Sequence, residues 1–529
     1  MAAHYQTHTF TLANLIPSLD LGEAAAIQGR NLCLDSRQLK TGDIFIALVG
    51  AQIDGRKFIA KAIEMGAVAI LVEADKEWQG VAWLGAVPVI AIERLATIVS
   101  EIAGRFYAEP SKKMSLIGIT GTNGKTTCSL LAAQLLAHLQ QKSAVVGTIG
   151  FGVVDAQSIA PIAQQISLLQ STGLTTPDPI ALQRILAGLL HAGAKSVALE
   201  VSSHSLQQKR VAGVHFTTAV FTNLTQDHLD YHGDLVTYGK AKAELLQAQG
   251  LQHVIVNLDD AWAKGLLAQI PASITAISYS IQTKADVYVE NIQLHASGVR
   301  ANIITPWGQG ELKSPLLGEF NLSNLLAVIA SVCVQGFSLE QVLPLVEKLE
   351  PAPGRMQSVI VDEALQEVQV IVDYAHTPDA LENTLKALHE HKAGQVWTLF
   401  GCGGDRDKAK RPLMGRIAER LSDCVIVTND NPRSEDPAVI AADIVAGMKN
   451  PNRCLVLADR AQAIDFAVQQ AKAGDIILVA GKGHEDYQIF ANQSLPFSDI
   501  KQARLALQRR IAKREAGHTV SSDKSGGQV

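Results

Sequence analysis

The sequence has few cysteines, and none are spaced as a metal-binding or redox pair. They are Cys33, Cys128, Cys333, Cys402, Cys424 and Cys454, six in all, with no C-x-x-C pair. This scatter excludes a dense disulfide framework and a structural zinc site. We therefore expect a reduced, cytosolic protein.

Long apolar runs and an excess of positive charge are also missing. Residues 1–20 contain no basic segment followed by a long apolar core, which argues against a signal peptide. No apolar run approaches the roughly 20 residues that a membrane helix needs. The 46 Lys and Arg against 51 Asp and Glu give a formal net charge of −5. We therefore expect neither nucleic acid nor a membrane as a partner.

What the sequence does have is enough apolar material for several cores. It is 529 residues long, with 47% hydrophobic and 18% charged residues, which excludes a wholly disordered chain. At about 150 residues per domain, this length suggests three or four domains. Residues 516–529 are polar and rich in Gly and Ser, so we expect a disordered tail there.

Strand and helix patterns alternate along the rest of the chain. The segment 41–50 is predicted as a turn followed by a strand. Further predicted strands cover 67–73, 114–120, 143–150, 196–201, 218–224, 253–258, 368–374, 396–401, 424–430 and 475–481, and predicted helices include 58–66 and about 125–140. Nearly continuous apolar strands separated by helices indicate parallel sheets covered on both faces. We predict an α/β fold with a small N-terminal domain (1–112), a central P-loop-type ATPase domain (113–352) and a Rossmann-like C-terminal domain (353–515).

A glycine-rich segment at 118–127 joins the predicted strand 114–120 to the helix that follows. Its sequence GITGTNGKTT is a variant phosphate loop, because the strict G-x-x-x-x-G-K-[ST] spacing would need glycine where Ile119 stands. Backbone N–H groups of such a loop wrap phosphate oxygens at a helix N-terminus. Lys125 can reach the β- and γ-phosphates, and the Thr126 hydroxyl can bind Mg²⁺. The alternative is an ordinary glycine-rich turn.

Polar groups follow other strands of the same predicted domain. Glu200 ends the strand 196–201, and the segment 223–233, NLTQDHLDYHG, follows the next strand. Carboxylate and imidazole groups near a phosphate loop suit a divalent metal. Either segment alone is more often a capped, solvated loop, but three such strand ends favour a ligand site.

Four polar clusters follow the strands of the third domain. They are 373–379, 401–407, 430–433 and 481–485, and we expect them to converge on one crevice. Arg406 and Arg433 could bind carboxylates there, while Glu485 could bind an ammonium group, which fits an amino acid with extra charge. Taken alone, Arg433 could equally form a surface salt bridge.

These motifs together resemble the Mur ligases, the ATP-dependent amino-acid-adding enzymes of bacterial peptidoglycan synthesis. The segments GTNGKTT (121–127), EVSSHSLQQKR (200–210), NLTQDHLDYHG (223–233), FNxxN (320–324) and DYAHTPDA (373–380) carry the resemblance. It runs from about Leu34 to Glu485. The segment 35–37, Asp-Ser-Arg, resembles members that add the third peptide residue, and Asp430-Asn-Pro-Arg433 resembles those that add meso-2,6-diaminopimelate.

The resemblance implies roles for particular residues. ATP phosphates would be bound by Gly121, Thr122, Asn123, Gly124, Lys125, Thr126 and Thr127, and the rest of the nucleotide by Asn321, Arg355 and Asp373. Mg²⁺ would be held by Thr126, Glu200, His228 and Lys242, the last as a carbamate; Lys125, Lys242, His228 and Glu200 are the catalytic set. From the residues alone, Lys242 would be a solvated helix lysine.

Two further groups of residues would bind the other substrates. The UDP-N-acetylmuramoyl-L-alanyl-D-glutamate site would contain Leu34, Ser36, Thr175, Thr176, Ser202, Gln208 and Arg210, and the diaminopimelate site Arg406, Asp430, Asn431, Pro432, Arg433, Gly481 and Glu485. The resemblance implies a monomeric, cytoplasmic enzyme that serves cell-wall synthesis and, through it, cell shape and division. The alternatives are a lysine-adding Mur ligase, a folylpolyglutamate synthetase, or a P-loop ATPase acting on a protein partner.

Overall fold

The computed structural model describes residues 10–50, 53–140, 142–295, 298–362, 364–491 and 493–522. Contacts divide the chain into two compact units. The first holds the residues up to Gly121, Ala132–Asn223 and Asp234–Ser278, and the second holds Thr122–Leu131, Leu224–Gly233 and the residues from Tyr279 on. Within the described residues, no helix has both the length and the apolarity needed to cross a membrane.

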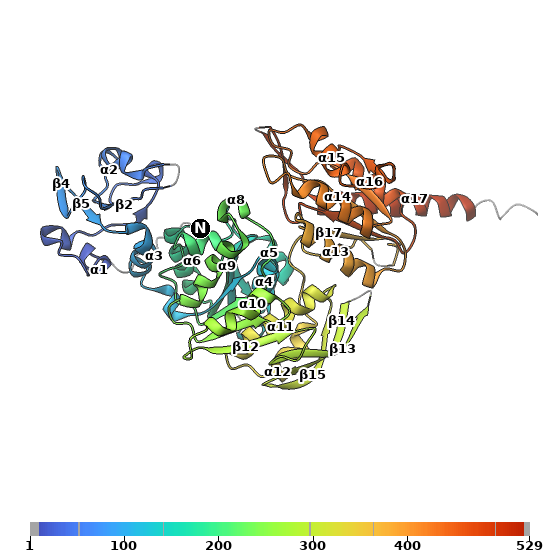
Figure 1. The fold of residues 1–529 in the computed structure, drawn as a ribbon, viewed down its shortest axis with the longest axis horizontal. Helices are drawn as coiled ribbons and strands as arrows, with labels where there is room; N and C mark the ends of the chain where they lie inside the picture. The colour runs from blue at the N-terminus through green and yellow to red at the C-terminus, as the bar shows by residue number, and fades with distance from the viewer. Residues whose placement is uncertain are drawn as a thin grey trace, which may run out of the picture. The chain divides into compact units, whose positions relative to one another are not determined.

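The N-terminal domain is built on a five-stranded sheet in the order β1-β2-β3-β5-β4 (Figure 1). Its elements are α1 (Leu12–Leu15), β1 (Leu32–Cys33), β2 (Ile44–Ala47), α2 (Ile59–Glu64), β3 (Ala69–Glu73), β4 (Val81–Leu84), β5 (Val87–Ile92) and α3 (Leu95–Phe106). Alternate residues of β2 enter different cores: Ile44 packs with α1 and α3, and Phe45 packs with α2. Because strand side chains alternate between faces, helices cover both sides of this sheet.

The central domain contains a ten-stranded mixed sheet in the order β15-β14-β13-β12-β11-β10-β6-β9-β7-β8. Its first elements are β6 (Ser115–Thr120), α4 (Lys125–Gln140), β7 (Lys142–Gly147), β8 (Gly150–Asp155), α5 (Ile162–Ser167), α6 (Pro179–His191), β9 (Ser196–Glu200), α7 (Ser203–Gln207), β10 (Thr218–Phe221), α8 (Leu229–His232), α9 (Leu235–Ala243) and β11 (His253–Asn257). The remaining ones are α10 (Ala261–Leu266), β12 (Thr275–Ser280), β13 (Val287–His295), β14 (Gly298–Thr305), β15 (Gly308–Ser314), α11 (Glu319–Cys333) and α12 (Leu339–Val346).

The strands next to the glycine loop are parallel, as predicted: β6 pairs with β9 and β10. The single strand predicted at 143–150 is wrong, because β7 and β8 form an antiparallel hairpin that turns at residues 148–149. Gly150, with φ 140°, allows the chain to turn there. Continuous apolar character hid this turn, since apolar residues occupy both sides of it.

The C-terminal domain has a six-stranded sheet in the order β16-β17-β21-β18-β19-β20, parallel except for the edge strand β16, and a hairpin β22–β23. Its elements are β16 (Gln357–Val359), β17 (Gln369–Asp373), α13 (Pro378–His391), β18 (Val396–Phe400), α14 (Lys410–Leu421), β19 (Cys424–Val427), α15 (Pro437–Val445), β20 (Cys454–Val456), α16 (Arg460–Gln470), β21 (Ile476–Ala480), β22 (Tyr487–Phe490), β23 (Gln493–Pro496) and α17 (Asp499–Ser522). Ile371 faces the core with α13, α14 and α15, whereas Val370 and Val372 face α16 and α17. This doubly covered parallel sheet is the predicted Rossmann-like arrangement.

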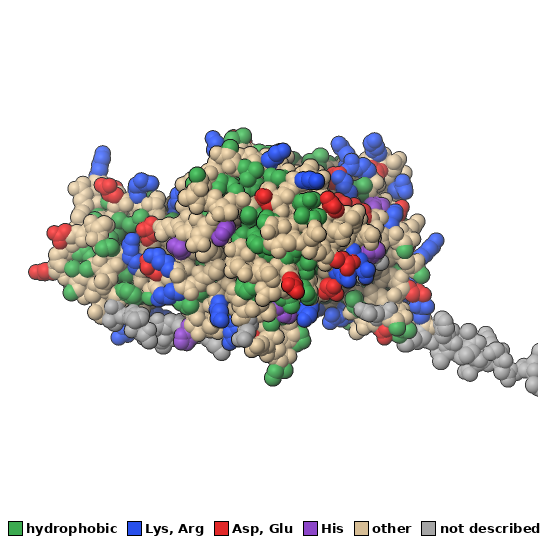
Figure 2. All heavy atoms as spheres, turned by 90° about the horizontal axis from the view of Figure 1, so that it is seen from below, with side chains coloured by type: hydrophobic (Ala, Val, Ile, Leu, Met, Phe, Trp, Pro, Cys, Tyr) green, Lys and Arg blue, Asp and Glu red, His purple; other side chains and the backbone are tan. Residues whose placement is uncertain are grey.

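The last helix is longer than the sequence suggested. α17 continues to Ser522, so the prediction of a disordered tail is wrong for residues 516–522, and residues 523–529 lie outside the described residues. A run of good helix formers precedes this stretch, and helix propagation costs far less than nucleation. On the face shown in Figure 2, basic and acidic side chains lie interspersed, in keeping with the small net charge of −5.

Candidate functional site

The glycine loop lies where β6 ends and α4 begins. Gly121 and Gly124 have φ of 150° and 87°, a region that L side chains rarely adopt. A side chain at Gly121 would also collide with the Thr222 hydroxyl. The loop therefore requires glycine at both positions, and its backbone turns into the N-terminus of a 16-residue helix, a favourable place for an anion.

Side chains of the second unit fix the shape of this loop. Thr122 Oγ1 donates to the Thr225 carbonyl at 3.1 Å and accepts from the Thr225 N–H at 2.9 Å. Asn123 Nδ2 donates to Asp379 Oδ2 at 3.0 Å. Lys125 Nζ donates to the Thr122 carbonyl at 2.8 Å, so its ammonium group lies against the loop backbone. Asp379, whose pKa is raised by burial, was part of a predicted motif without an assigned role.

Thr126 and Thr127 lie in the first turn of α4 and are buried. Lys242, on α9, is also buried, with 1% of its surface exposed, whereas Lys240 on the same helix is exposed. Lys242 Nζ donates to the Gly121 carbonyl at 2.7 Å and lies 4.3 Å from the centre of the Tyr238 ring. Lys242 is therefore not a solvated helix lysine. Burying an ammonium group is costly, so we infer that Lys242 has a function at the glycine loop.

Glu200 ends β9 and is 1% exposed. Its Oε1 accepts from the Thr148 N–H at 2.9 Å, and its Oε2 accepts from Thr148 Oγ1 at 3.0 Å. A side chain at Gly147 would collide with the Glu200 carboxylate. The sequence analysis missed Thr148, because reading 143–150 as one strand concealed its place in a turn.

Five of the seven residues predicted for the UDP-substrate form a connected patch beside Glu200 in the first unit. Thr175 Oγ1 donates to Thr148 Oγ1 at 3.1 Å, since the Thr148 hydroxyl hydrogen is directed to Glu200, and Thr176 Oγ1 donates to the Glu200 carbonyl at 2.8 Å. The other contacts are Ser202 N–H to Thr176 Oγ1 at 3.1 Å, Arg210 Nη1 to the Thr176 carbonyl at 2.9 Å, and Arg210 Nε to Gln208 Oε1 at 2.9 Å. The patch thus offers hydroxyl, amide and guanidinium groups to one ligand.

Leu34 and Ser36 lie away from that patch, in the N-terminal domain. Leu34 lines a pocket of about 590 Å³, together with residues of α6. Arg37, Lys40 and Arg184 line it together with Asp35, Asp43 and Asp178, so the cavity presents basic and acidic groups in equal number. Ser36 is buried beside it, in a turn capped by Asp35. A pocket of this size with several polar and charged groups suits a polar small-molecule ligand.

The predicted metal ligands are divided between the two units. Glu200 and Lys242 belong to the first unit, and Thr126 and His228 belong to the second. His228 has φ of 53° and places Nε2 3.4 Å from Asp227 Oδ2. Among the described residues, no group of three or more His, Cys, Asp and Glu is placed to hold a metal by itself. A shared Mg²⁺ site therefore stays a prediction.

Asn321, Arg355 and Asp373 all lie in the second unit. Asp373 accepts from the Met356 N–H at 2.7 Å, and burial raises its pKa. The Arg355 guanidinium lies 4.5 Å from the centre of the Tyr374 ring, and its buried Nε has no hydrogen-bond partner. Asn321 is buried and donates to a carbonyl of its own chain segment at 2.8 Å. An unsatisfied buried guanidinium nitrogen points to an absent acceptor such as a phosphate.

The four polar clusters of the C-terminal domain meet at the carboxyl edge of neighbouring strands. The Gly481 N–H donates to the Asp373 carbonyl at 3.0 Å, and Arg433 Nη1 donates to the Gly404 carbonyl at 2.9 Å. Arg433 is half-buried and has φ of 53°, while Arg406 is exposed. Pro432 is buried, and its carbonyl leaves no room for a side chain at Gly404. The predicted convergence on one edge is thus present.

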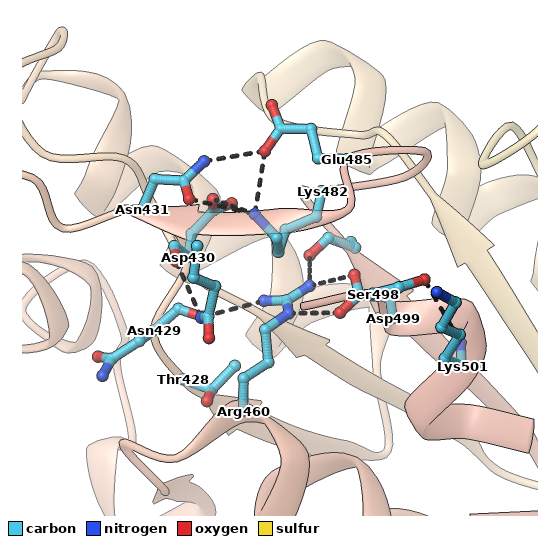
Figure 3. Close-up of polar contacts among 12 residues, drawn as sticks. Thr428, Asn429, Asp430, Asn431, Arg460, Lys482, Glu485, Ser498, Asp499 and Lys501 are labelled. Carbon is cyan, nitrogen blue, oxygen red and sulfur yellow. Dashed lines mark hydrogen bonds and ion pairs between the residues drawn. The ribbon is translucent and has the colours of Figure 1, made fainter. Parts of the chain in front are cut away.

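Glu485 already has a cationic partner, which the sequence analysis missed. Lys482 is fully buried and lies 3.0 Å from Glu485 Oε2 (Figure 3). Asn431 Nδ2 donates to the same oxygen at 2.8 Å. Beneath them, Arg460 pairs with Asp499 at 2.7 Å, and neither side chain is exposed. Sequence patterns could not find this pair, because its members start two helices far apart in the chain.

Family models match all three domains of the chain. The Mur ligase family, catalytic domain matches residues 30–107, the Mur ligase middle domain matches 119–332, and the Mur ligase, glutamate ligase domain matches 354–483. The chain belongs to the Mur ligase family. Members of this family are ATP-dependent ligases.

Curated relatives of this Mur ligase include UDP-N-acetylmuramoyl-L-alanyl-D-glutamate--2,6-diaminopimelate ligases. The one from Coxiella burnetii is 45% identical over 94% of this chain and 99% of its own, and the one from Pseudomonas aeruginosa is 47% identical over 90% and 95%. A solved structure of a ligase with this name is 37% identical, covers 95% of this chain and 99% of its own, and superposes with a TM-score of 0.70.

Two histidines of this Mur ligase predict a pH-dependent stability. His376 and His484 flank Tyr374, and burial lowers the pKa of each to about 4. Both are therefore neutral in the folded protein at pH 7, whereas in the unfolded chain they take up protons below about pH 6.5. Their contribution is fully present above pH 6.5 and is lost as pH falls toward 4.

Between pH 7 and pH 5, we expect the free energy of unfolding to fall by about 1–2 kcal/mol for each histidine. Urea unfolding of the ligand-free protein at both pH values measures this fall. The double variant His376→Gln/His484→Gln should show a smaller fall. An equal fall in the variant and the wild type would contradict the assignment.

Proposed function

We propose that this Mur ligase adds meso-2,6-diaminopimelate to the D-glutamate γ-carboxylate of UDP-N-acetylmuramoyl-L-alanyl-D-glutamate, in peptidoglycan synthesis. The observation that carries the proposal is the carboxyl edge of the C-terminal sheet, where two arginines and a carboxylate lie together. The side chains of Arg433 and Arg406 both lie next to Gly403. A Cβ atom added to Gly403 would lie 2.9 Å from Arg433 Nη1 and 3.7 Å from Arg406 Cγ. Lysine lacks the distal carboxylate that a guanidinium fork binds.

Names of relatives support the same substrate. The curated ligases from Coxiella burnetii and Pseudomonas aeruginosa add 2,6-diaminopimelate, by their names. We propose that the enzyme acts as a monomer in the cytoplasm.

The first chemical step must activate a carboxylate. A carboxylate is a poor acyl donor, so the γ-carboxylate takes the γ-phosphoryl group of ATP and becomes an acyl phosphate. Phosphoryl transfer needs positioning and charge neutralisation more than covalent help. Lys125 would neutralise charge on the transferred group, and the glycine-loop N–H groups would hold the phosphates. Arg355, with its unsatisfied Nε, would bind another phosphate oxygen.

Mg²⁺ fits the residue types present, because hydroxyl and carboxylate oxygens are its preferred ligands. Thr126, Glu200 and a carbamate on Lys242 would provide such oxygens, and His228 would provide a nitrogen ligand. When bound, the ion would neutralise phosphate and carboxylate oxygens. Two hydrogen bonds from Thr148 fix the orientation of the buried Glu200 carboxylate, as a metal ligand requires.

In the second step, an unprotonated amine of diaminopimelate attacks the acyl carbon and phosphate leaves. The Arg433 side chain would hold the distal carboxylate, and Glu485 would hold the ammonium group at that end. These contacts orient the reacting amine without touching it. The acyl phosphate must also be shielded from water during this step.

Phosphate release in the presence of UDP-N-acetylmuramoyl-L-alanyl-D-glutamate and one amino acid tests the proposal. We expect release with diaminopimelate, and far less with lysine or glutamate. Preference for lysine would indicate a lysine-adding ligase, and preference for glutamate with a folate substrate would indicate a folylpolyglutamate synthetase. ATP turnover that needs no muramoyl dipeptide would support the ATPase with a protein partner instead.

The assignment of Lys242 gives a separate prediction. If its amine is carbamylated, Lys242→Ala should be nearly inactive, because Mg²⁺ loses a carboxylate-like ligand. A short carboxylic acid or bicarbonate should partly restore its activity, while Lys240→Ala, which alters an exposed lysine, should retain full activity. Lys242→Glu should keep little but measurable activity. Failure of every small acid to raise the Lys242→Ala rate would count against a carbamate.

A further inference from the structure

Lys482 is a fully buried lysine that the reaction steps above do not use. It follows β21 after Gly481, and none of its side chain is exposed. Its Nζ lies 3.0 Å from Glu485 Oε2, 3.2 Å from Asn431 Oδ1 and 3.9 Å from Asp430 Oδ1. Figure 3 shows this ammonium group between Glu485 and the side chains of Asp430 and Asn431, which follow β19. A lysine is rarely buried so completely unless its charge is met.

The contacts to Glu485 use only one of its two oxygens. Oε2 accepts from Lys482 Nζ at 3.0 Å and from Asn431 Nδ2 at 2.8 Å. Among the hydrogen bonds of the described residues, none reaches Oε1. The Glu485 carboxylate is 17% exposed. It is therefore held firmly through one oxygen while the other stays available to a ligand, which is how a preorganised binding group is built.

Lys482 also separates two carboxylates. Asp430 is buried, and burial raises its pKa while Arg460 and Lys482 oppose the rise. Arg460 is committed to Asp499 through two hydrogen bonds. Without Lys482, the two carboxylates would lose the ammonium group that lies between them, and Glu485 Oε2 would keep only its hydrogen bond from Asn431.

We propose that Lys482 is a positioning residue that holds the Glu485 carboxylate oriented to receive the ammonium group of the amino-acid substrate. This inference rests on the proposed function. The charged and titratable groups around the pair are Asp430 after β19, Tyr374 after β17, Arg460 of α16, Asp499 of α17, and His484 and Tyr487 beside Glu485.

The test is Lys482→Met, which keeps the length of the side chain and removes its charge. At about pH 7 we expect the KM for diaminopimelate to rise about 30-fold, as for one partner of a buried charge pair. The KM values for ATP and the UDP-substrate should stay within about twofold of wild type. The kcat at saturating diaminopimelate should change less than the KM, because Lys482 does not touch the reacting amine. Lys501→Met, an exposed lysine on α17, is the matched control.

A double variant keeps the test decisive if Lys482→Met does not fold. Lys482→Met/Glu485→Gln removes both charges, and its KM for diaminopimelate should match that of Glu485→Gln alone. An unchanged KM in Lys482→Met, or a double variant far worse than Glu485→Gln, would overturn the proposal. A wild-type enzyme that does not consume diaminopimelate would instead refute the proposed function.

Discussion

Replacing Lys125 with alanine should abolish ligation and leave the fold intact. Lys125 Nζ donates to the Thr122 carbonyl at 2.8 Å, within the loop itself, and loss of one such hydrogen bond costs about 1 kcal/mol. In the reaction it would face the phosphates, where loss of one preorganised charge typically slows catalysis by about 100-fold to 1,000-fold. Phosphate release with diaminopimelate, at saturating substrates, measures the loss.

The matched control is Lys240→Ala, which removes an exposed lysine from α9 and should leave the rate unchanged. Circular dichroism and the unfolding midpoint should be the same for wild type and both variants. A Lys125→Ala protein that is folded and releases phosphate at the normal rate would refute the role of this lysine.

Much of the fold and site followed from local patterns. The strand at 114–120 and the helix from Lys125 were predictable, because an apolar run, glycines and a helix start coincide there. The grouping of 373–379 with 481–485 was predictable too, since parallel strands bring their carboxyl ends together. This prediction rests on the direction of the strands in a parallel sheet and not on any contact between side chains.

What the sequence could not reveal depends on burial and on partners distant in the chain. Lys242 and Lys240 are two residues apart on α9, yet one is buried and the other exposed, and only packing distinguishes them. Lys482 lies in the motif 481–485, in which the sequence analysis assigned roles to Gly481 and Glu485 only. The Arg460–Asp499 pair joins residues 39 positions apart, and no local pattern connects two such side chains.

Loss of the Arg433 side chain should reduce the preference for diaminopimelate over lysine. The two amino acids differ in one distal carboxylate, and Arg433 is the residue we assign to it. Its Nη1 already donates to the Gly404 and Asn431 carbonyls, at 2.9 and 3.4 Å, and the side chain is half-buried rather than buried. When lysine is bound, the Arg433 guanidinium therefore loses less than a fully buried guanidinium without a partner would. We expect Arg433 to contribute about 2–3 kcal/mol to the preference for diaminopimelate over lysine, which is one to two decades in kcat/KM.

The backbone at this position lets the side chain be tested alone. The Arg433 N–H donates to the Ile489 carbonyl at 3.0 Å, and the Ala491 N–H donates to the Arg433 carbonyl at 2.6 Å. The hairpin β22–β23 thus holds φ at 53° whichever L residue is present. Arg433→Ala should keep this conformation while removing the guanidinium.

The measurement is kcat/KM for diaminopimelate and for lysine in wild type, Arg433→Ala and Arg433→Lys. Arg433→Ala should lose one to two decades on diaminopimelate and little on lysine, by the free energies above. Arg433→Lys should not restore the preference, because an ammonium group cannot make the two parallel hydrogen bonds of a guanidinium. If Arg433→Ala still prefers diaminopimelate as strongly as wild type, selectivity resides elsewhere. Arg406, whose side chain also lies next to Gly403, would then be the residue to replace next.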